Sequence, residues 1–172
     1  IYDPNDIELR PNCTDPRRDD IAGYYSHITA LDRNFGRITG VLDELGIADD
    51  TILVFTSDHG DMLGSHGFHR KQRPWDESIL VPFIVRYPRL VPAGARTSVV
   101  LNSVDVMPSL LSLAGVEAPA TCEGTDLSHV MRGERGRRPA PCSALVQNPC
   151  PFADAASLPE WRGVRTERHT YI

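Results

Sequence analysis

The sequence predicts an α/β fold, in which part of a mixed, largely parallel sheet is flanked by helices and a smaller α+β portion follows. From Ile21 to Leu45, apolar residues recur every three or four positions, which is the period of a helix with one apolar face, and Gly46 is placed to end it. Thr51–Thr56 is a continuous β-branched and aromatic run, which is typical of a strand covered by helices on both faces. A helix, a short loop and a buried strand make half of a βαβ unit, from which parallel sheets are built.

The chain on either side of these two elements carries further signals. Residues 1–17 are polar and interrupted by prolines, so we expect a lead-in in which Asp15 and Pro16 begin the long helix. Val81–Arg86 is expected to form a second short strand. Pro82 must lie near its start or at an edge, because proline cannot donate to a sheet.

The C-terminal half is expected to hold a second helix and several shorter elements. Asn102 or Ser103 can cap a helix over Val104–Ala114, in which Pro108 falls near the first turn, where proline is tolerated. Gly115 then ends this helix. The shorter elements are a helix from Thr125 to Met131, a strand at Ser143–Val146 and an alternating segment, Gly163–Ile172.

Composition excludes several classes of protein. The 172 residues are 41% hydrophobic and 24% charged, which is ordinary for a globular domain and unlike a disordered or collagen-like chain. The chain has 18 Lys and Arg against 23 Asp and Glu, for a net charge of −5, so we expect no nucleic-acid partner. No apolar run approaches the ~18 residues that a membrane span needs.

The compartment of the protein is left open by the sequence. The chain has neither a signal peptide nor an initial methionine, so we expect that the protein begins before Ile1. A soluble protein that is periplasmic, secreted or cytoplasmic agrees with this composition. Cys142 and Cys150 can pair in an oxidising compartment or remain as thiols.

The segment from Ser57 to Lys71 carries the candidate site. Asp58, His59 and Gly60 directly follow the first predicted strand, and ligands of open α/β sheets bind beyond the carboxyl ends of strands. Asp58 supplies a carboxylate oxygen and His59 an imidazole nitrogen, which together suit Ca²⁺, Mg²⁺ or Mn²⁺. Gly60 allows the chain to turn away close to a ligand.

Three interpretations of this segment are open. It can be a polar turn without a ligand. It can be a self-contained zinc site made by Asp58, His59, His66 and His69, although the spacing is not that of a zinc finger or of a His-Glu-x-x-His motif. It can also be half of a hydrolase metal site whose other ligands lie outside the chain.

The third interpretation gains from a resemblance to a known family. Residues 51–88, TILVFTSDHGDMLGSHGFHRKQRPWDESILVPFIVRYP, resemble the C-terminal part of the sulfatase family in the alkaline phosphatase superfamily. Other segments resemble the helix before this strand and later parts of the family in the same order, namely GYYSHITALDRNFGRITGVLDELG, NSVDVMPSLLSLAGV, GTDLSHVMRGE and WRGVRTERHTYI. The resemblance covers about residues 20–172 and implies an alkaline phosphatase-like fold. It divides the chain into a lead-in (1–17), the C-terminal part of the α/β core with the metal-ligand strand (18–115), and a smaller, truncated α+β portion (116–172).

The resemblance also implies roles for three residues. Asp58 and His59 match the metal ligands, with Ca²⁺ as the preferred cation and Mn²⁺ or Mg²⁺ as alternatives. Lys71 matches the catalytic lysine that contacts the sulfate oxygens, where a point charge offsets negative charge on the transferred group. No family role falls on His66 or His69, which we expect to be loop histidines with local hydrogen bonds.

The nucleophile of the family is not matched in this chain. It is a Cys or Ser in the motif Cys/Ser-x-Pro-x-Arg, which lies near the N-terminus of family members. This Cys or Ser is converted to formylglycine. The sequence Cys13-Thr14-Asp15-Pro16-Arg17 looks similar, but its proline stands one position too late and it directly precedes the long helix. We therefore expect the formylglycine upstream of this chain, and no activity from the 172 residues alone.

The resemblance implies metal-dependent hydrolysis of a sulfate ester of a small molecule or carbohydrate. In that mechanism the hydrated formylglycine attacks sulfur, while the metal and Lys71 stabilise the oxyanion. One alternative is a phosphonate or phosphate ester hydrolase of the same superfamily, because it shares the Asp-His and Lys layout. Another is a non-catalytic fragment or pseudoenzyme that acts in binding or assembly. Oligomerisation is left open.

Overall fold

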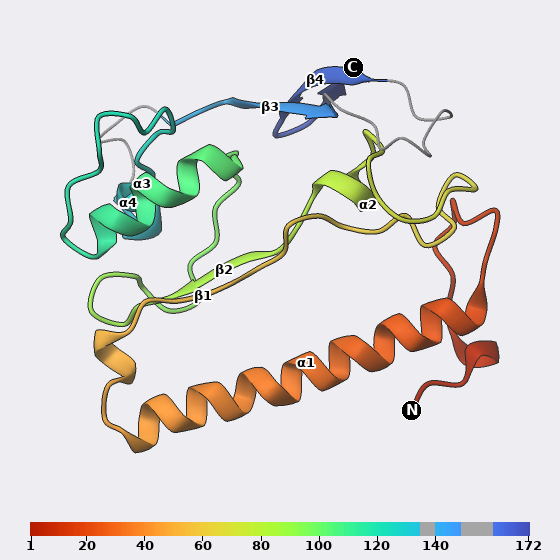
Figure 1. The fold of residues 1–172 in the computed structure, drawn as a ribbon, viewed down its shortest axis with the longest axis horizontal. Helices are drawn as coiled ribbons and strands as arrows, with labels where there is room; N and C mark the ends of the chain where they lie inside the picture. The colour runs from red at the N-terminus through yellow and green to blue at the C-terminus, as the bar shows by residue number, and fades with distance from the viewer. Residues whose placement is uncertain (135–139, 149–159) are drawn as a thin grey trace. The chain divides into compact units, whose positions relative to one another are not determined.

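A computed structural model describes residues 1–134, 140–148 and 160–172 of the chain (Figure 1). The chain folds as two compact units, which are described one at a time. The first consists of Ile1–Ala48 and Ser57–Val81, and the second of Asp49–Thr56 and Pro82–Ile172. Among the described residues, no helix combines the length and the apolar character that crossing a membrane requires.

The long helix α1 (Arg18–Glu44) belongs to the first unit and confirms the helix predicted from the apolar period. Its N-cap is Arg17, so the prediction that Asp15 and Pro16 begin the helix is wrong. Asp15 is engaged elsewhere, because its carboxylate Oδ2 lies 2.8 Å from His69 Nε2 and accepts a hydrogen bond from it.

The apolar core of the first unit lies at the N-terminal end of α1. Ile21 and Ala22 of the helix pack with Ile7 of the lead-in, and Leu63 packs against this cluster. In Figure 1 the red lead-in, which contains the short 3₁₀ helix η1 (Pro4–Asp6), and the yellow loop lie at this end of α1. Leu63 belongs to the candidate site segment, so the site loop is anchored to the same core.

The remaining apolar face of α1 is not packed as the sequence predicts. Ile28, Leu31, Ile38 and Val41 are 50–57% exposed, and Leu45, just beyond the helix, is 65% exposed. A helix with such a stripe usually packs against a core. Nothing in the described part of the chain covers this stripe.

The second unit contains the two predicted strands, β1 (Leu53–Thr56) and β2 (Phe83–Arg86). They pair antiparallel, with Leu53 opposite Arg86, and Pro82 stands just before β2 as expected. β1 is partly buried, not fully covered on both faces as predicted. Every strand pair between described residues is antiparallel, so the parallel part of the predicted sheet is not found within them.

Helix α3 (Ser103–Leu113) confirms the second predicted helix. Asn102 and Asp105 form a capping box, in which the Asn102 side chain accepts from the Ser103 amide at 2.8 Å and the Asp105 side chain accepts from the Asn102 amide at 2.9 Å. Pro108 lies inside the helix, beyond the first turn where it was expected.

The remaining elements are short. Helix α2 (Asp76–Ile79) lies in the first unit and α4 (Ser128–Met131) in the second. α4 begins after the predicted Thr125, because Asp126 accepts a hydrogen bond from the Ser128 amide at 2.8 Å and forms a turn there. Cys150 lies outside the described residues, so its pairing with Cys142 stays a prediction. One antiparallel sheet contains β3 (Ser143–Asn148), β4 (Trp161–Thr166) and β5 (Thr170–Tyr171), in that order.

Candidate functional site

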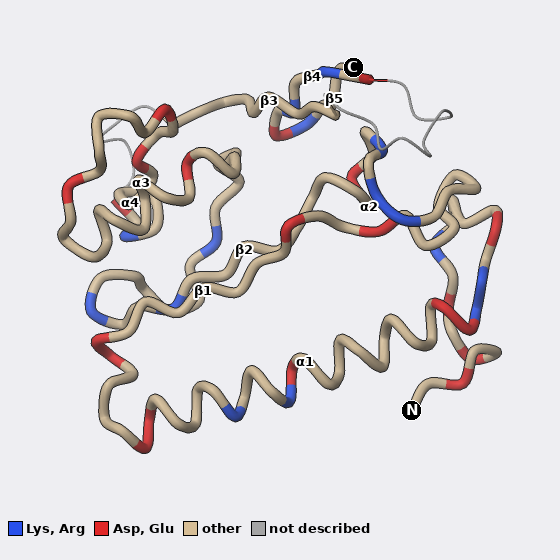
Figure 2. Tube along the Cα trace, viewed as in Figure 1, with Lys and Arg blue, Asp and Glu red and all other residues tan. Residues whose placement is uncertain are grey.

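The candidate site lies in the loop that runs from the end of β1 to α2, in the first unit. Lys71 Nζ lies 2.8 Å from His59 Nε2, and Asp58 Oδ2 lies 3.4 Å from the same nitrogen. The structure therefore places all three predicted site residues around one atom. Blue marks the basic residues of this loop ahead of α2 in Figure 2.

Hydrogen bonds fix the orientation of the His59 ring. Nδ1 lies 2.8 Å from the Gly60 carbonyl oxygen, which can only accept, so Nδ1 carries the proton. Nε2 then presents a lone pair, which accepts a hydrogen bond from the Lys71 ammonium. A neutral imidazole with such a lone pair is the form that binds metal ions.

Asp58 presents its carboxylate to solvent, with 82% of the side chain exposed against 37% for His59. Its Oδ1 accepts from the His59 amide at 3.0 Å, and Oδ2 lies toward the imidazole. Desolvation acts to raise the pKa of Asp58. The electrostatic interaction with His59, the hydrogen bond from the His59 amide and the charge of Lys71 outweigh it, so the pKa lies below its ordinary value. The carboxylate is therefore ionised at neutral pH.

Asp58 and His59 fit a shared divalent cation. Asp58 Oδ2 and His59 Nε2 are both acceptors, so no hydrogen bond joins them across their 3.4 Å separation. Two ligands ~2.3 Å from one ion and roughly at right angles lie ~3.3 Å apart, which agrees with this spacing. Among the described residues, no three His, Cys, Asp or Glu side chains form a cluster that could hold a metal. At this point of the loop the described chain thus offers two donor atoms that suit a cation.

The other two histidines of the segment bind the lead-in. His66 Nε2 accepts from the Asn12 side-chain amide at 3.1 Å, and its ring stacks on Trp75 with the centroids 4.9 Å apart. His69 Nε2 donates to Asp15 Oδ2 at 2.8 Å. Both lead-in partners are 54 residues away in the sequence, so the expectation of local hydrogen bonds is wrong. The four-ligand zinc site is not formed among the described residues.

Glu77 of α2 joins the lead-in to the site loop, and no motif in the sequence singles it out for this contact. Its Oε1 accepts from the Asn12 side-chain amide at 2.7 Å. Desolvation acts to raise the pKa of Glu77, but hydrogen bonds from Asn12 and Ser65 and the electrostatic interaction with His66 outweigh it, so the pKa lies below its ordinary value. Asn12 is 65 residues away in the sequence, so no local pattern indicates this contact.

Gly60 passes very close to the backbone of α2. Its amide donates to the Ser78 carbonyl at 2.9 Å, and a side-chain carbon at position 60 would overlap the Glu77 carbonyl oxygen. The sequence predicts a glycine here for a turn close to a ligand. The structure gives it a second reason, which is the approach of α2.

Cys13, which we do not expect to be the nucleophile, lies against the site loop. It forms an isolated antiparallel bridge with Ser65, and its Sγ lies 3.6 Å from the Leu63 carbonyl oxygen. The side chain is partly buried. This arrangement is typical of a packed thiol.

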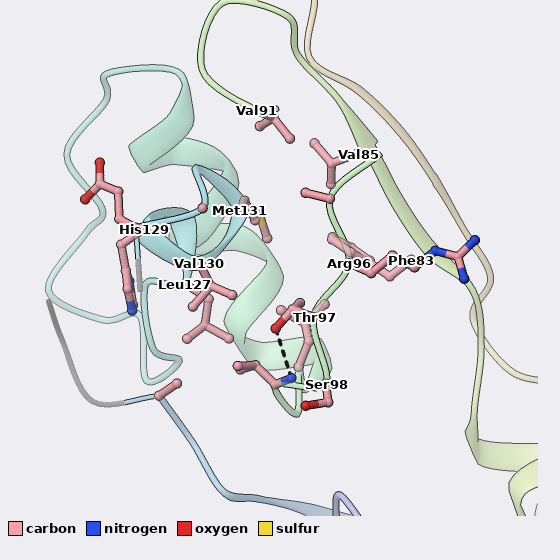
Figure 3. Close-up of a pocket in the computed structure, with 16 residues that line it drawn as sticks. Phe83, Val85, Val91, Arg96, Thr97, Ser98, Leu127, His129, Val130 and Met131 are labelled. Atoms are coloured by element: carbon pink, nitrogen blue, oxygen red, sulfur yellow. Dashed lines mark hydrogen bonds between the residues drawn. The ribbon is translucent and has the colours of Figure 1, made fainter. Parts of the chain in front are cut away.

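A hollow of about 570 Å³ lies in the second unit (Figure 3). Aliphatic side chains make up much of its lining, and the figure shows Val85 and Val91 across from Val130. His129 also lines it, is 5% exposed, and has no hydrogen-bond partner for either ring nitrogen in the described part of the chain. In Figure 3 its ring points away from Val85 and Val91, so it does not reach across the hollow.

Comparison with protein families gives two matches. The model described as "Sulfatase" matches residues 2–116, and the model described as "N-sulphoglucosamine sulphohydrolase, C-terminal" matches residues 64–172. Among curated proteins, an ulvan-active sulfatase of Formosa agariphila is 37% identical over 99% of this chain. The match covers 34% of that protein, so the chain spans about a third of its length.

Solved structures agree with these matches. A protein in complex with its substrate, D-glucosamine-2-N,6-O-disulfate, is 34% identical with a TM-score of 0.74, over 81% of this chain and 28% of that one. A phosphonate monoester hydrolase of Agrobacterium radiobacter is 27% identical with a TM-score of 0.75, over 91% of this chain and 34% of that one. The likeness to these structures confirms the predicted α/β fold class.

Proposed function

Because this chain belongs to the sulfatase family of the alkaline phosphatase superfamily, we propose that Asp58, His59 and Lys71 form part of a site that hydrolyses a sulfate ester. The observation that carries the proposal is the meeting of a carboxylate oxygen, an imidazole lone pair and an ammonium group around His59 Nε2. Cleavage of a sulfate ester develops negative charge on the sulfate oxygens, and a cation and a fixed ammonium group stabilise such charge.

Asp58 and His59 would hold the divalent cation, with Ca²⁺ preferred and Mn²⁺ or Mg²⁺ as alternatives. When bound, such a cation acts as a Lewis acid toward the sulfate oxygens. The Gly60 carbonyl keeps the His59 ring turned with Nε2 outward. Lys71 occupies the Nε2 lone pair in this structure, so it must release that nitrogen when a cation is held there. Its ammonium is then free to contact a sulfate oxygen.

The nucleophile would come from residues outside these 172. Cys13 does not match the family motif, and its thiol lies against the Leu63 carbonyl. A formylglycine supplied by another part of the protein agrees with a chain that spans about a third of the ulvan-active sulfatase. The 172 residues would then be the C-terminal part of a sulfatase, with roughly half of its active site.

The substrate would be a sulfated carbohydrate. A relative named for activity on ulvan and a solved structure that holds a glucosamine disulfate support this class. The likeness to a phosphonate monoester hydrolase keeps phosphonate esters as the second candidate, because the three side chains suit either tetrahedral anion.

Titration of the chain with Mn²⁺ tests the metal assignment, because a paramagnetic ion broadens the NMR signals of nearby nuclei. We expect the His59 ring and the Gly60 amide to broaden first and to recover with excess Ca²⁺. Asp58→Ala should remove this effect. Asp32→Ala, which makes the same charge change on the exposed side of α1, should leave it intact. Broadening that survives Asp58→Ala would contradict the assignment.

Hydrolysis assays separate the two substrate classes. They require a polypeptide that joins this chain to a nucleophile segment, offered glucosamine 6-sulfate and a phenyl phosphonate monoester. A higher kcat/KM on the sulfate supports the proposal, and a higher value on the phosphonate selects the second candidate. A folded protein that turns over neither would instead indicate a binding or assembly role.

A further inference from the structure

The site loop between His59 and Lys71 is closed at its base by backbone hydrogen bonds. The Met62 amide donates to the Arg70 carbonyl at 2.8 Å, and the Gly64 amide donates to the Phe68 carbonyl at 2.8 Å. Met62 has no exposed surface, so one side of the base is also packed. The loop therefore behaves as a narrow hairpin, with His59 before one stem and Lys71 after the other.

Asp61 joins the two stems with a single oxygen. Its Oδ1 accepts from the Leu63 amide at 2.9 Å and from the Arg70 amide at 3.1 Å. Asp61 lies two residues after His59, and Arg70 lies immediately before Lys71. One carboxylate oxygen thus fixes both the stretch of chain that follows His59 and the stretch that leads into Lys71.

The backbone at this base is held in an unusual conformation. Leu63, Arg70 and Gln72 have φ angles of 44°, 64° and 68°, in the left-handed region that non-glycine residues seldom adopt. Such residues persist only where the surroundings determine their conformation. Asp61 Oδ1 binds the amides of Leu63 and Arg70, two of these three residues. Without this acceptor, Arg70 is free to return to an ordinary φ, which redirects Lys71.

We propose that Asp61 is a positioning residue, whose Oδ1 holds the Lys71 ammonium beside His59 by fixing the amides of Leu63 and Arg70. The proposal rests on the proposed function and deepens it, because it names the side chain that keeps Lys71 next to His59, from where its ammonium can turn to a sulfate oxygen. The hydrogen bond between His69 and Asp15 attaches the same loop to the lead-in, and the Asp15 carboxylate accepts there from the His69 ring and not from a stem amide. The two carboxylates therefore differ in what they hold, although both bind the loop.

Lys71 is the only lysine in the sequence, so an amine label reports on it alone apart from the N-terminus. Reductive methylation with ¹³C-formaldehyde gives one lysine NMR signal, which Lys71→Arg assigns by removing it. In the unmodified sequence we expect a nuclear Overhauser contact from this signal to the His59 ring. Asp61→Ala should lose that contact, whereas Asp15→Ala, with the same charge change on the same loop, should keep it.

Two further variants keep the proposal testable if Asp61→Ala fails to fold. Asp61→Asn retains an oxygen acceptor at the same place, so it should rescue the contact. Asp61→Glu retains the charge but moves the oxygen by one methylene, so it should lose the contact. The proposal would be overturned if Asp61→Asn lost the contact between the Lys71 label and the His59 ring while Asp61→Glu kept it. It would also be overturned if Asp61→Ala kept this contact or if Asp15→Ala lost it. Because this test contains neither metal nor substrate, its failure would leave the sulfatase proposal standing.

Discussion

Replacement of Lys71 tests whether its ammonium contacts the sulfate. A unit charge ~4 Å from an oxyanion, at an effective dielectric constant of ~20, contributes ~4 kcal/mol. Removal of one oxyanion-hole donor costs ~2.7–4 kcal/mol, or ~10²–10³-fold in kcat, which is the same range. We therefore expect Lys71→Ala to lower kcat/KM on a sulfate ester by ~10²–10³-fold. The melting temperature should change little, because the contact shown for the Lys71 ammonium is to His59 and not to an apolar core.

The arginine variant makes this test sharper. Lys71→Arg keeps the charge, but a planar guanidinium needs more room than an ammonium and prefers two parallel hydrogen bonds. The space beside His59 Nε2 is shared with Asp58 Oδ2, so we expect Lys71→Arg to fail to restore activity. Steady-state kinetics of the complete sulfatase measure both variants, with Arg33→Ala on the exposed side of α1 as the control for charge loss. Near wild-type kcat/KM in Lys71→Arg would refute the assignment of Lys71 as a substrate ligand.

Three further changes test the loop, its acid response and the missing nucleophile. Gly60→Ala should destabilise the chain by about 1–3 kcal/mol in urea unfolding, because the added carbon meets the Glu77 carbonyl, and an unchanged midpoint would contradict this. The pKa of Glu77 in the folded chain lies below its ordinary value of 4.5. The ionised carboxylate therefore stabilises the fold above pH 4.5, and this stabilisation is lost as the pH falls through the pKa of the folded chain. Glu77→Gln should therefore flatten the stability curve below pH 4.5, and an equally steep curve would count against the Asn12 contact. The 172 residues alone should not hydrolyse an aryl sulfate, and turnover that Cys13→Ser abolishes would make Cys13 the nucleophile.

The elements that the sequence predicts well are those whose signals lie within one segment. The helix from Arg18 is visible because its apolar residues repeat every three or four positions, and α3 is visible because Asn102 can cap it and Gly115 follows it. The start of α1 was missed because Asp15 binds His69, which lies 54 residues further on. No local pattern reports a contact of that range.

The same limit applies to the candidate site. Asp58 and His59 stand directly after a recognisable strand, so the sequence alone singles them out as candidates. Lys71 needs the family resemblance, because twelve residues separate it from His59. Asp61 makes one hydrogen bond that a local sequence pattern predicts and one that it does not. Its bond to the Leu63 amide is an ordinary Asx turn, whereas its bond to the Arg70 amide depends on the closed loop.

The proposed metal site and the apolar face of α1 both lack partners among the described residues. Asp58 and His59 are two proposed ligands without a third beside them in the described chain, and the stripe that contains Ile28 and Leu31 lies open. The chain spans 34% of the ulvan-active sulfatase, so we expect a further sulfatase segment to supply both kinds of partner. A segment that binds the folded chain stabilises it by mass action. Protection of α1 amides from hydrogen exchange and Mn²⁺ affinity should therefore rise together when such a segment is joined to the chain. A rise in metal affinity with α1 amides still unprotected would show that the stripe and the site are completed by different partners.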